Sequence, residues 1–249
     1  MNLEGQVALV SGGLGHIGRA ISCRLTELGA AVAVGDIWPS EQAAPLLQKL
    51  GRKARYDQVD VSDDLAVDRW LQAVEQSLGL PNLVIPSAAI VTMSSLRSLT
   101  PAEWRKELSI NLDGAFFVAH AAAKRLIAAG RPGRIVFIGS WAASVPHAHV
   151  PTYCVAKAGL RMLMKQMALE YAPNGILVNE VAPGYVDGGL NNQAFVENTD
   201  LREQCRLKVP IRQLMTADDV AFSVAHLCDP RNRHMTGSVV LMDGGLSLK

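Results

Sequence analysis

Residues 7–18, Val-Ala-Leu-Val-Ser-Gly-Gly-Leu-Gly-His-Ile-Gly, place a short apolar run directly before a glycine-rich turn. The run Val7–Val10 predicts a buried strand, and the stretch Ile17–Leu28 predicts a helix. The pattern G-x-G-x-x-G is satisfied by Gly13, Gly15 and Gly18. Such glycines permit a tight turn and a close approach of phosphate to the helix N-terminus, whose free N–H groups attract anions. A glycine-rich turn alone is a weak signal, but its position between a strand and a helix favours a dinucleotide site.

Apolar runs and helical stretches alternate from this unit to the end of the chain. The predicted strands are Ala30–Val34, Ala54–Val61, Leu83–Ala89, Arg134–Gly139, Gly175–Val181 and Ser238–Met242. The predicted helices are Glu41–Leu50, Asp63–Leu78, Pro101–Ala129 (one long helix or two joined ones), Tyr153–Tyr171 and Asp218–Cys228. Nearly continuous apolar strands that alternate with helices predict a parallel sheet covered on both faces. We therefore expect an α/β fold, a single-domain Rossmann-like doubly wound sheet over residues 1–249.

The composition fits one large globular domain. The chain has 249 residues and a net charge of +1, which gives no support for nucleic acid or an anionic membrane as a partner. No window approaches 18 uninterrupted apolar residues, and no basic stretch precedes an apolar core at the N-terminus. The cysteines are scattered without metal-ligand spacing, so we expect reduced thiols, no metal site and a cytoplasmic protein.

One long polar segment, about Gly184–Met215, interrupts the alternation of strands and helices. It contains the pairs Gly188-Gly189 and Asn191-Asn192 and has an irregular pattern. A loop of this length in a compact domain is commonly a lid or binding element, or else mobile. We expect a substrate lid at about residues 184–215.

Acidic residues follow the second and third predicted strands. Asp36 ends the second strand, where a carboxylate can accept hydrogen bonds from the adenosine ribose hydroxyls. A 2′-phosphate beside it would cost on the order of 4 kcal/mol at an effective dielectric constant of about 20, and no Arg or Lys adjoins Asp36 to offset this. The sequence thus predicts NAD rather than NADP as cofactor. Asp60 and Val61 either hold the adenine edge or belong to the N-cap of the next helix.

Tyr153 and Lys157 stand four residues apart, on one face of a predicted helix. The pKa of a tyrosine is about 10, and a cation about 4 Å away supplies roughly 4 kcal/mol, enough with help from oxidised nicotinamide to bring the phenol near neutrality. Such a phenol can accept a proton from an alcohol as hydride leaves its carbon. The pair alone is a poor signal. Ser140, at the end of a strand, can donate a hydrogen bond to substrate, and Asn111 is polar in mid-helix.

With these residues in register, the chain resembles the short-chain dehydrogenase/reductase family over essentially its whole length. The family's turn T-G-x-x-x-G-x-G is matched by Ser11, Gly12 and Gly18, and two later motifs by Pro183-Gly184 and Asp243-Gly244-Gly245. Its Asn-Ser-Tyr-Lys tetrad corresponds to Asn111, Ser140, Tyr153 and Lys157. The resemblance implies seven parallel strands, interconversion of a secondary alcohol and a ketone, and a proton relay through Tyr, Lys and an Asn-held water. It also implies a homotetramer built on the helices after Pro101 and from Tyr153.

The implied cofactor-binding residues lie in the turn and at strand ends: Gly12, Gly13, Gly15, Ile17, Gly18, Asp36, Asp60, Val61, Ala88, Ala89, Pro183, Gly184 and Val186. Three positions depart from the family. His16 replaces a motif glycine and either donates to the pyrophosphate or points to solvent. Ser87 replaces an asparagine whose hydrogen bond stabilises strands. Gly188 replaces a threonine that contacts the nicotinamide amide, a contact that the Val186 backbone can supply.

By analogy, the substrate pocket involves Trp141, His147 and Tyr185, with Ala142, His149 and parts of Leu190–Leu214 around them. The segment 184–215 balances acidic and basic side chains and holds no cationic cluster. Polar residues outnumber aromatic ones, namely His147, His149, Asn191, Asn192 and Gln193. This favours a small polar alcohol, sugar or polyol, although both histidines are equally compatible with exposed loop positions.

Two other classes of function stay open. A sensor or scaffold protein would bind the dinucleotide without chemistry, but it is expected to lose Tyr or Lys, and both Tyr153 and Lys157 are present. A dehydratase or epimerase that uses bound NAD transiently is disfavoured, because related enzymes of that kind are longer and carry an added substrate domain.

Overall fold

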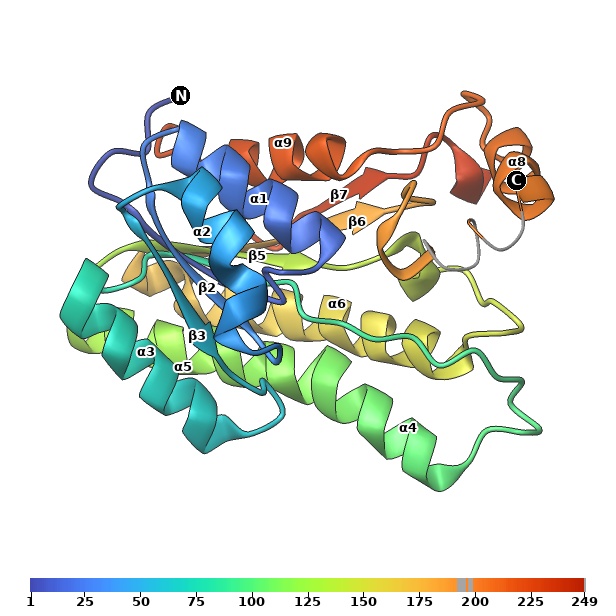
Figure 1. Cartoon of the computed structure of the whole chain (residues 1–249), viewed down its shortest axis with the longest axis horizontal. Coiled ribbons are helices and arrows are strands. Elements are labelled where there is room, and N and C mark those ends of the chain that lie inside the picture. The colour runs from blue at the N-terminus through green and yellow to red at the C-terminus, as the bar shows by residue number, and fades with distance from the viewer. Residues whose placement is uncertain (192–195, 197–198, 249) are drawn as a thin grey trace.

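The computed structural model describes residues 1–191, 196 and 199–248. Within them, seven parallel strands form one sheet in the order β3-β2-β1-β4-β5-β6-β7 (Figure 1). The strands are β1 (Val7–Ser11), β2 (Ala31–Asp36), β3 (Ala54–Gln58), β4 (Leu83–Pro86), β5 (Gly133–Ile138), β6 (Ile176–Pro183) and β7 (Val239–Met242). The predicted α/β doubly wound fold is confirmed.

Helices cover both faces of the sheet, with α1, α2 and α9 on one side and α3, α5 and α6 on the other (Figure 1). The helices are α1 (His16–Glu27), α2 (Ala44–Leu50), α3 (Asp64–Leu78), α4 (Pro101–Leu108), α5 (Ala115–Ala128), α6 (Pro151–Tyr171), α8 (Thr199–Lys208) and α9 (Ala217–Cys228). Short helical turns are η1 (Ser40–Ala43), η2 (Ser109–Gly114), η3 (Trp141–Ala143), η4 (Ala172–Asn174), η5 (Gly189–Asn191) and η6 (Leu246–Leu248). No helix in the described part of the chain is long and apolar enough to span a membrane.

Two apolar cores lie on the two faces of the sheet, because successive strand side chains point to opposite sides. Leu9 and Phe137 pack toward α3, α5 and α6, whereas Val10 and Ile138 pack toward α1 and α9. This double burial is why the strands are apolar almost without interruption. Truncating Phe137 to alanine is expected to cost about 3–5 kcal/mol of stability.

The long helical stretch after Pro101 is two helices joined by a π-helical turn, η2. Gly114 lies in this turn, and a β-carbon there would stand 2.7 Å from Cγ2 of Val61. A π turn widens the helix locally and is often found at functional sites. Asn111 therefore lies in a distorted turn between two helices. This position accounts for a polar residue in what the sequence presents as one long helix.

The polar segment after β6 is more regular than its sequence pattern suggested, because it contains η5 and α8. α8 is rich in charged residues, so it lacks the apolar stripe by which a helix is recognised. Arg202 of α8 forms an ion pair with Asp187, just after β6, and Arg206 pairs with Glu203 one turn earlier. Asn192 and Gln193 lie outside the described residues.

Candidate active site

The site lies at the carboxyl ends of the central strands, where β1 and β4 are neighbours and the chain leaves them in opposite directions. Ligands of doubly wound sheets bind at such a switch point. A β-carbon on Gly12 would stand 2.6 Å from Cα of Ala88, so the two strand ends are in close contact. The Ser11 hydroxyl accepts hydrogen bonds from the N–H groups of Ser87, at 3.2 Å, and Ala88, at 3.4 Å. These hydrogen bonds connect the ends of β1 and β4 without an asparagine at position 87.

The glycine-rich turn fits a dinucleotide pyrophosphate. Gly13 and Gly18 have no room for a side chain. A β-carbon on Gly13 would stand 2.5 Å from Val34, and one on Gly18 would stand 2.3 Å from the Gly12 carbonyl oxygen. α1 starts after Gly15 with no side-chain cap and no acidic residue in its first turn. Its first N–H groups and the positive end of its dipole are thus available to an anion.

Asp36 lies beside this turn, as predicted from the sequence. Its carboxylate accepts hydrogen bonds from the Leu14 N–H at 2.9 Å and the Ile37 N–H at 2.8 Å. Asp60 accepts from the Ser62 N–H and hydroxyl, while the N-cap of α3 is Asp63. Capping by Asp60 is therefore excluded, and its role toward adenine stays a prediction.

The end of β6 and the segment after it close the cofactor side of the site. The Gly184 N–H donates to Met242 O at 2.7 Å, and a β-carbon on Gly184 would stand 2.9 Å from Cα of Asp243. Val186 is buried and forms a parallel bridge with Met215. The exposed His16 does not point freely into solvent, because its ring lies against Gly188.

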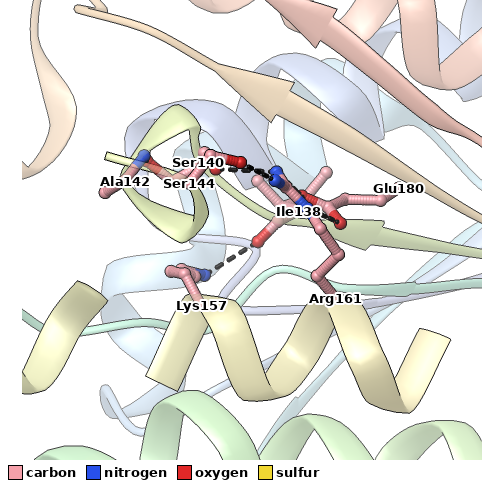
Figure 2. Close-up of polar contacts among 7 residues, drawn as sticks. All are labelled: Ile138, Ser140, Ala142, Ser144, Lys157, Arg161 and Glu180. Carbon is pink, nitrogen blue, oxygen red and sulfur yellow. Dashed lines mark hydrogen bonds and ion pairs between the residues drawn. The ribbon is translucent and has the colours of Figure 1, made fainter. Parts of the chain in front are cut away.

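The predicted tetrad comes from three parts of the fold, namely η2, the end of β5 and α6. Lys157 is buried on α6, with its Nζ 5.4 Å from the centre of the Tyr153 ring and donating to Ile138 O at 2.8 Å (Figure 2). Ser140 is buried at the end of β5, and its side chain favours a lower pKa of the Tyr153 phenol. The Asn111 side chain exchanges two hydrogen bonds of 2.8 Å with the backbone of Ile90, beyond β4.

Burial dominates the electrostatics of the pair on α6. It raises the pKa of Tyr153 to about 12, opposed by the Ser140 side chain. It lowers the pKa of Lys157 to about 8, opposed by the carboxylates of Glu180 and Glu107. In the chain without cofactor, burial is the largest effect on the phenol. The predicted shift toward neutrality, which includes the charge of oxidised nicotinamide, stays a prediction.

Three charged residues near the tetrad escaped the sequence interpretation. Glu107 and Glu180 are fully buried; the Glu107 Oε2 accepts from the Thr92 N–H at 3.2 Å, while Oε1 has no partner among the described residues. Arg161 forms an ion pair with Glu180 at 2.8 Å. Helical spacing was the available signal, since Glu107 lies four residues before Asn111 and Arg161 four residues after Lys157.

The three predicted substrate residues gather beside Ser140. The Trp141 ring lies 4.5 Å from that of His147 and 5.5 Å from that of Tyr185, both in edge-on geometry. Burial lowers the pKa of His147, and its Nε2 is buried without a hydrogen-bond partner in the described part of the chain. His149 is exposed. Tyr185 also borders a cavity of about 320 Å³ lined by Val209, Ile211, Gln213, Leu214, Met215, Asp219, Met242, Asp243 and Gly244.

A phosphate-binding turn at the switch point, together with a phenol, a hydroxyl and an ammonium at one strand end, defines a nicotinamide-dependent oxidoreductase. Among the described residues, no group of three His, Cys, Asp or Glu side chains could hold a metal. Residues 13–247 match the family model described as enoyl-(acyl carrier protein) reductase. The chain belongs to the short-chain dehydrogenase/reductase family.

Similar proteins match this chain over nearly its full length. It is 32% identical over 242 residues to cis-4-hydroxycyclohexanecarboxylate dehydrogenase of Sinomonas cyclohexanicum, with 96% of each chain covered. It is 30% identical over 246 residues to 3-oxoacyl-(acyl-carrier-protein) reductase FabG of Vibrio harveyi, with 99% of each covered. The solved gluconate 5-dehydrogenase of Burkholderia cenocepacia, in complex with NADP and tartrate, superposes with a TM-score of 0.93 at 29% identity, covering 100% of this chain and 97% of that one. The protein is accordingly an oxidoreductase that acts on alcohol or keto groups.

Proposed function

We propose that the protein is an NAD(H)-dependent dehydrogenase/reductase that interconverts a secondary alcohol and a ketone, with Tyr153 as the general acid and base. The observation that carries the proposal is the convergence of Tyr153, Ser140 and Lys157 at the carboxyl end of β5, beside a turn suited to pyrophosphate. Gly12, Gly13, Gly15, Ile17 and Gly18 would hold that pyrophosphate, with Asp36 at the adenosine ribose.

In this proposal, each residue of the site has a separate role in the transfer of one proton. Burial holds the Tyr153 phenol protonated, which suits donation of its proton to a ketone oxygen. The nicotinamide supplies the carbon that gives or takes hydride and, when oxidised, a positive charge near the phenol. Lys157 lowers the cost of the phenolate through its own charge, and Ser140 donates a hydrogen bond to the substrate oxygen. Asn111 anchors the loop after β4 beside them.

The choice of NAD rests on the Asp36 carboxylate. The gluconate 5-dehydrogenase structure contains NADP, which is a property of that protein. Here the carboxylate lies against the phosphate-binding turn through Leu14, where the negative charge of a 2′-phosphate would be repelled.

We propose a polar substrate, such as a sugar, polyol or other small alcohol. His147 supports this, because its neutral imidazole lies beside Trp141 and its buried Nε2 has no hydrogen-bond partner among the described residues, so that it can bind a hydroxyl group. The segment 184–215, with α8 tied back through Asp187, serves in this proposal as the lid over the substrate.

We further propose a cytoplasmic homotetramer. Exposed apolar side chains on α5, α6 and α9 support self-association, namely Phe116, Ile127, Val155, Met162, Leu169 and Phe222. The four free cysteines suit a reducing compartment. Sedimentation equilibrium tests the assembly, and a monomer at micromolar concentration contradicts it.

The deciding experiment is a spectrophotometric screen at 340 nm of secondary alcohols, polyols, sugars and hydroxy acids with NAD, and of the matching ketones with NADH. Turnover by the wild type that disappears in Tyr153→Phe, with NADH affinity retained, is the expected result. An active Tyr153→Phe variant contradicts the mechanism. Tight NADH binding with no turnover of any compound supports the sensor instead.

A further inference from the structure

Arg161 on α6 connects its helix to two other elements around the catalytic residues. It lies one helical turn after Lys157 on α6 and extends toward the sheet (Figure 2). Its Nε and Nη2 donate to the Glu180 carboxylate at 3.0 and 2.8 Å. Nη2 also donates to the Ser140 carbonyl oxygen at 3.0 Å, and Nη1 to the Ser144 hydroxyl at 2.5 Å. One guanidinium thus joins the catalytic helix, β6 and the turn after β5.

The space for Glu180 depends on a glycine. Glu180 is fully buried on β6, and a β-carbon at Gly139, the residue before Ser140, would stand 2.0 Å from its Oε1. A buried carboxylate is expensive unless it is paired and fully hydrogen-bonded. Replacing such a pair with apolar residues is often neutral for stability. Folding alone therefore does not explain why charges lie here.

The contacts point instead to the catalytic groups. Arg161 holds the carbonyl group of Ser140, and the Ser140 hydroxyl accepts from the Ala142 N–H at 3.1 Å, which fixes the residue from both sides. Lys157 donates to Ile138 O, two residues before Ser140. The carboxylates of Glu180 on β6 and Glu107 on α4 both oppose the lowering of the Lys157 pKa by burial.

We propose that the ion pair between Arg161 and the fully buried Glu180 is a positioning element of the catalytic site, which fixes the turn that carries Ser140. The proposal rests on the proposed role of Ser140 in the reaction. Neither Arg161 nor Glu180 touches substrate in it; both act through their neighbours.

A kinetic cycle tests the link to Ser140. Because a single substitution leaves one buried charge unpaired, the pair is removed together as Arg161→Met/Glu180→Leu. With the compound that the 340 nm screen identifies, this variant is expected to lose on the order of 10- to 100-fold in kcat, since small misplacements of catalytic groups have effects of this size. In a Ser140→Ala background, the same pair of substitutions is expected to lower kcat less than threefold further.

The matched control is the ion pair between Arg55 and Asp57 on β3, which also binds α3 through Ala73 O and the Ser77 hydroxyl. Arg55→Met/Asp57→Leu is expected to leave kcat unchanged. NADH affinity, measured by fluorescence titration, is expected to stay within twofold of wild type in both pair variants. Equal losses from Arg161→Met/Glu180→Leu with and without Ser140 overturn the proposal. A Ser140→Ala variant with full activity instead contradicts the proposed function.

Discussion

The imidazole of His16 lies against Gly188, so closely that a β-carbon at position 188 would stand 2.7 Å from its Nε2. Gly188 has a φ of +111°, a conformation that side chains rarely adopt. By the resemblance to the family, a glycine is expected at position 16 in the phosphate-binding turn and a threonine at position 188 after β6. Two departures from the family pattern, far apart in the sequence, therefore meet in space. The ring occupies room that a side chain at 188 would need.

Gly188→Ala is expected to weaken NADH binding about tenfold, because the new methyl group clashes with His16 and displaces the segment after β6 from the turn. Fluorescence titration of NADH measures this. The double variant His16→Ala/Gly188→Ala should recover part of the loss, since only backbone strain remains. Gly51→Ala is the control, with a φ of +76° and no atom within 4 Å of the added carbon. Equal affinities for Gly188→Ala and wild type contradict the contact.

Asp36→Asn is expected to raise the affinity for NADPH relative to NADH by about 100-fold or more. The substitution removes a charge whose repulsion of a 2′-phosphate is on the order of 4 kcal/mol, while the amide oxygen can still accept from the Leu14 N–H. Dissociation constants for both cofactors, measured on wild type and variant at one ionic strength, provide the check. Tighter binding of NADPH than NADH by the wild type shows the role given to Asp36 to be wrong.

Lys157→Met is expected to abolish turnover and yet stabilise the protein at neutral pH. The folded pKa of Lys157 is about 8, below the ordinary value of 10.5, so the unfolded state binds the proton more tightly. The folded state is thereby destabilised below pH 8, by about 3 kcal/mol, and this penalty fades as pH rises from 8 to 10.5. Urea unfolding at pH 7 and at pH 10 measures it. A variant less stable than wild type at pH 7 contradicts the burial of an ammonium.

His147→Phe is expected to raise KM for a polar substrate about tenfold with little change in kcat. The phenyl ring keeps the edge-on contact with Trp141 but removes the buried Nε2 that has no partner among the described residues. His149→Phe, at an exposed neighbouring position, is the control and should leave KM unchanged. Equal KM values for both variants and the wild type place substrate recognition elsewhere.

The architecture and the tetrad were accessible from the amino-acid order because their signals are local. Apolar runs such as Val7–Val10, doubly buried in the sheet, and the helical spacing of Tyr153 and Lys157 are visible over a few residues. Boundaries were less accurate, since α6 begins at Pro151 and β6 continues to Pro183. The helix α8 was missed, because a mostly polar exposed helix has no apolar stripe to reveal it.

Burial, and contacts between residues distant in the chain, were decided only by folding. The pKa of Tyr153 is raised rather than lowered because the phenol loses water when the loops and helices close around it, a quantity that no sequence spacing expresses. The Arg161–Glu180 pair requires α6, β6 and the missing side chain of Gly139 to meet at one point. His16 and Gly188 likewise become neighbours only when β1 and β6 end at the same edge of the sheet. Local order thus specified which chemistry the chain carries, and three-dimensional packing specified the electrostatic environment in which that chemistry takes place.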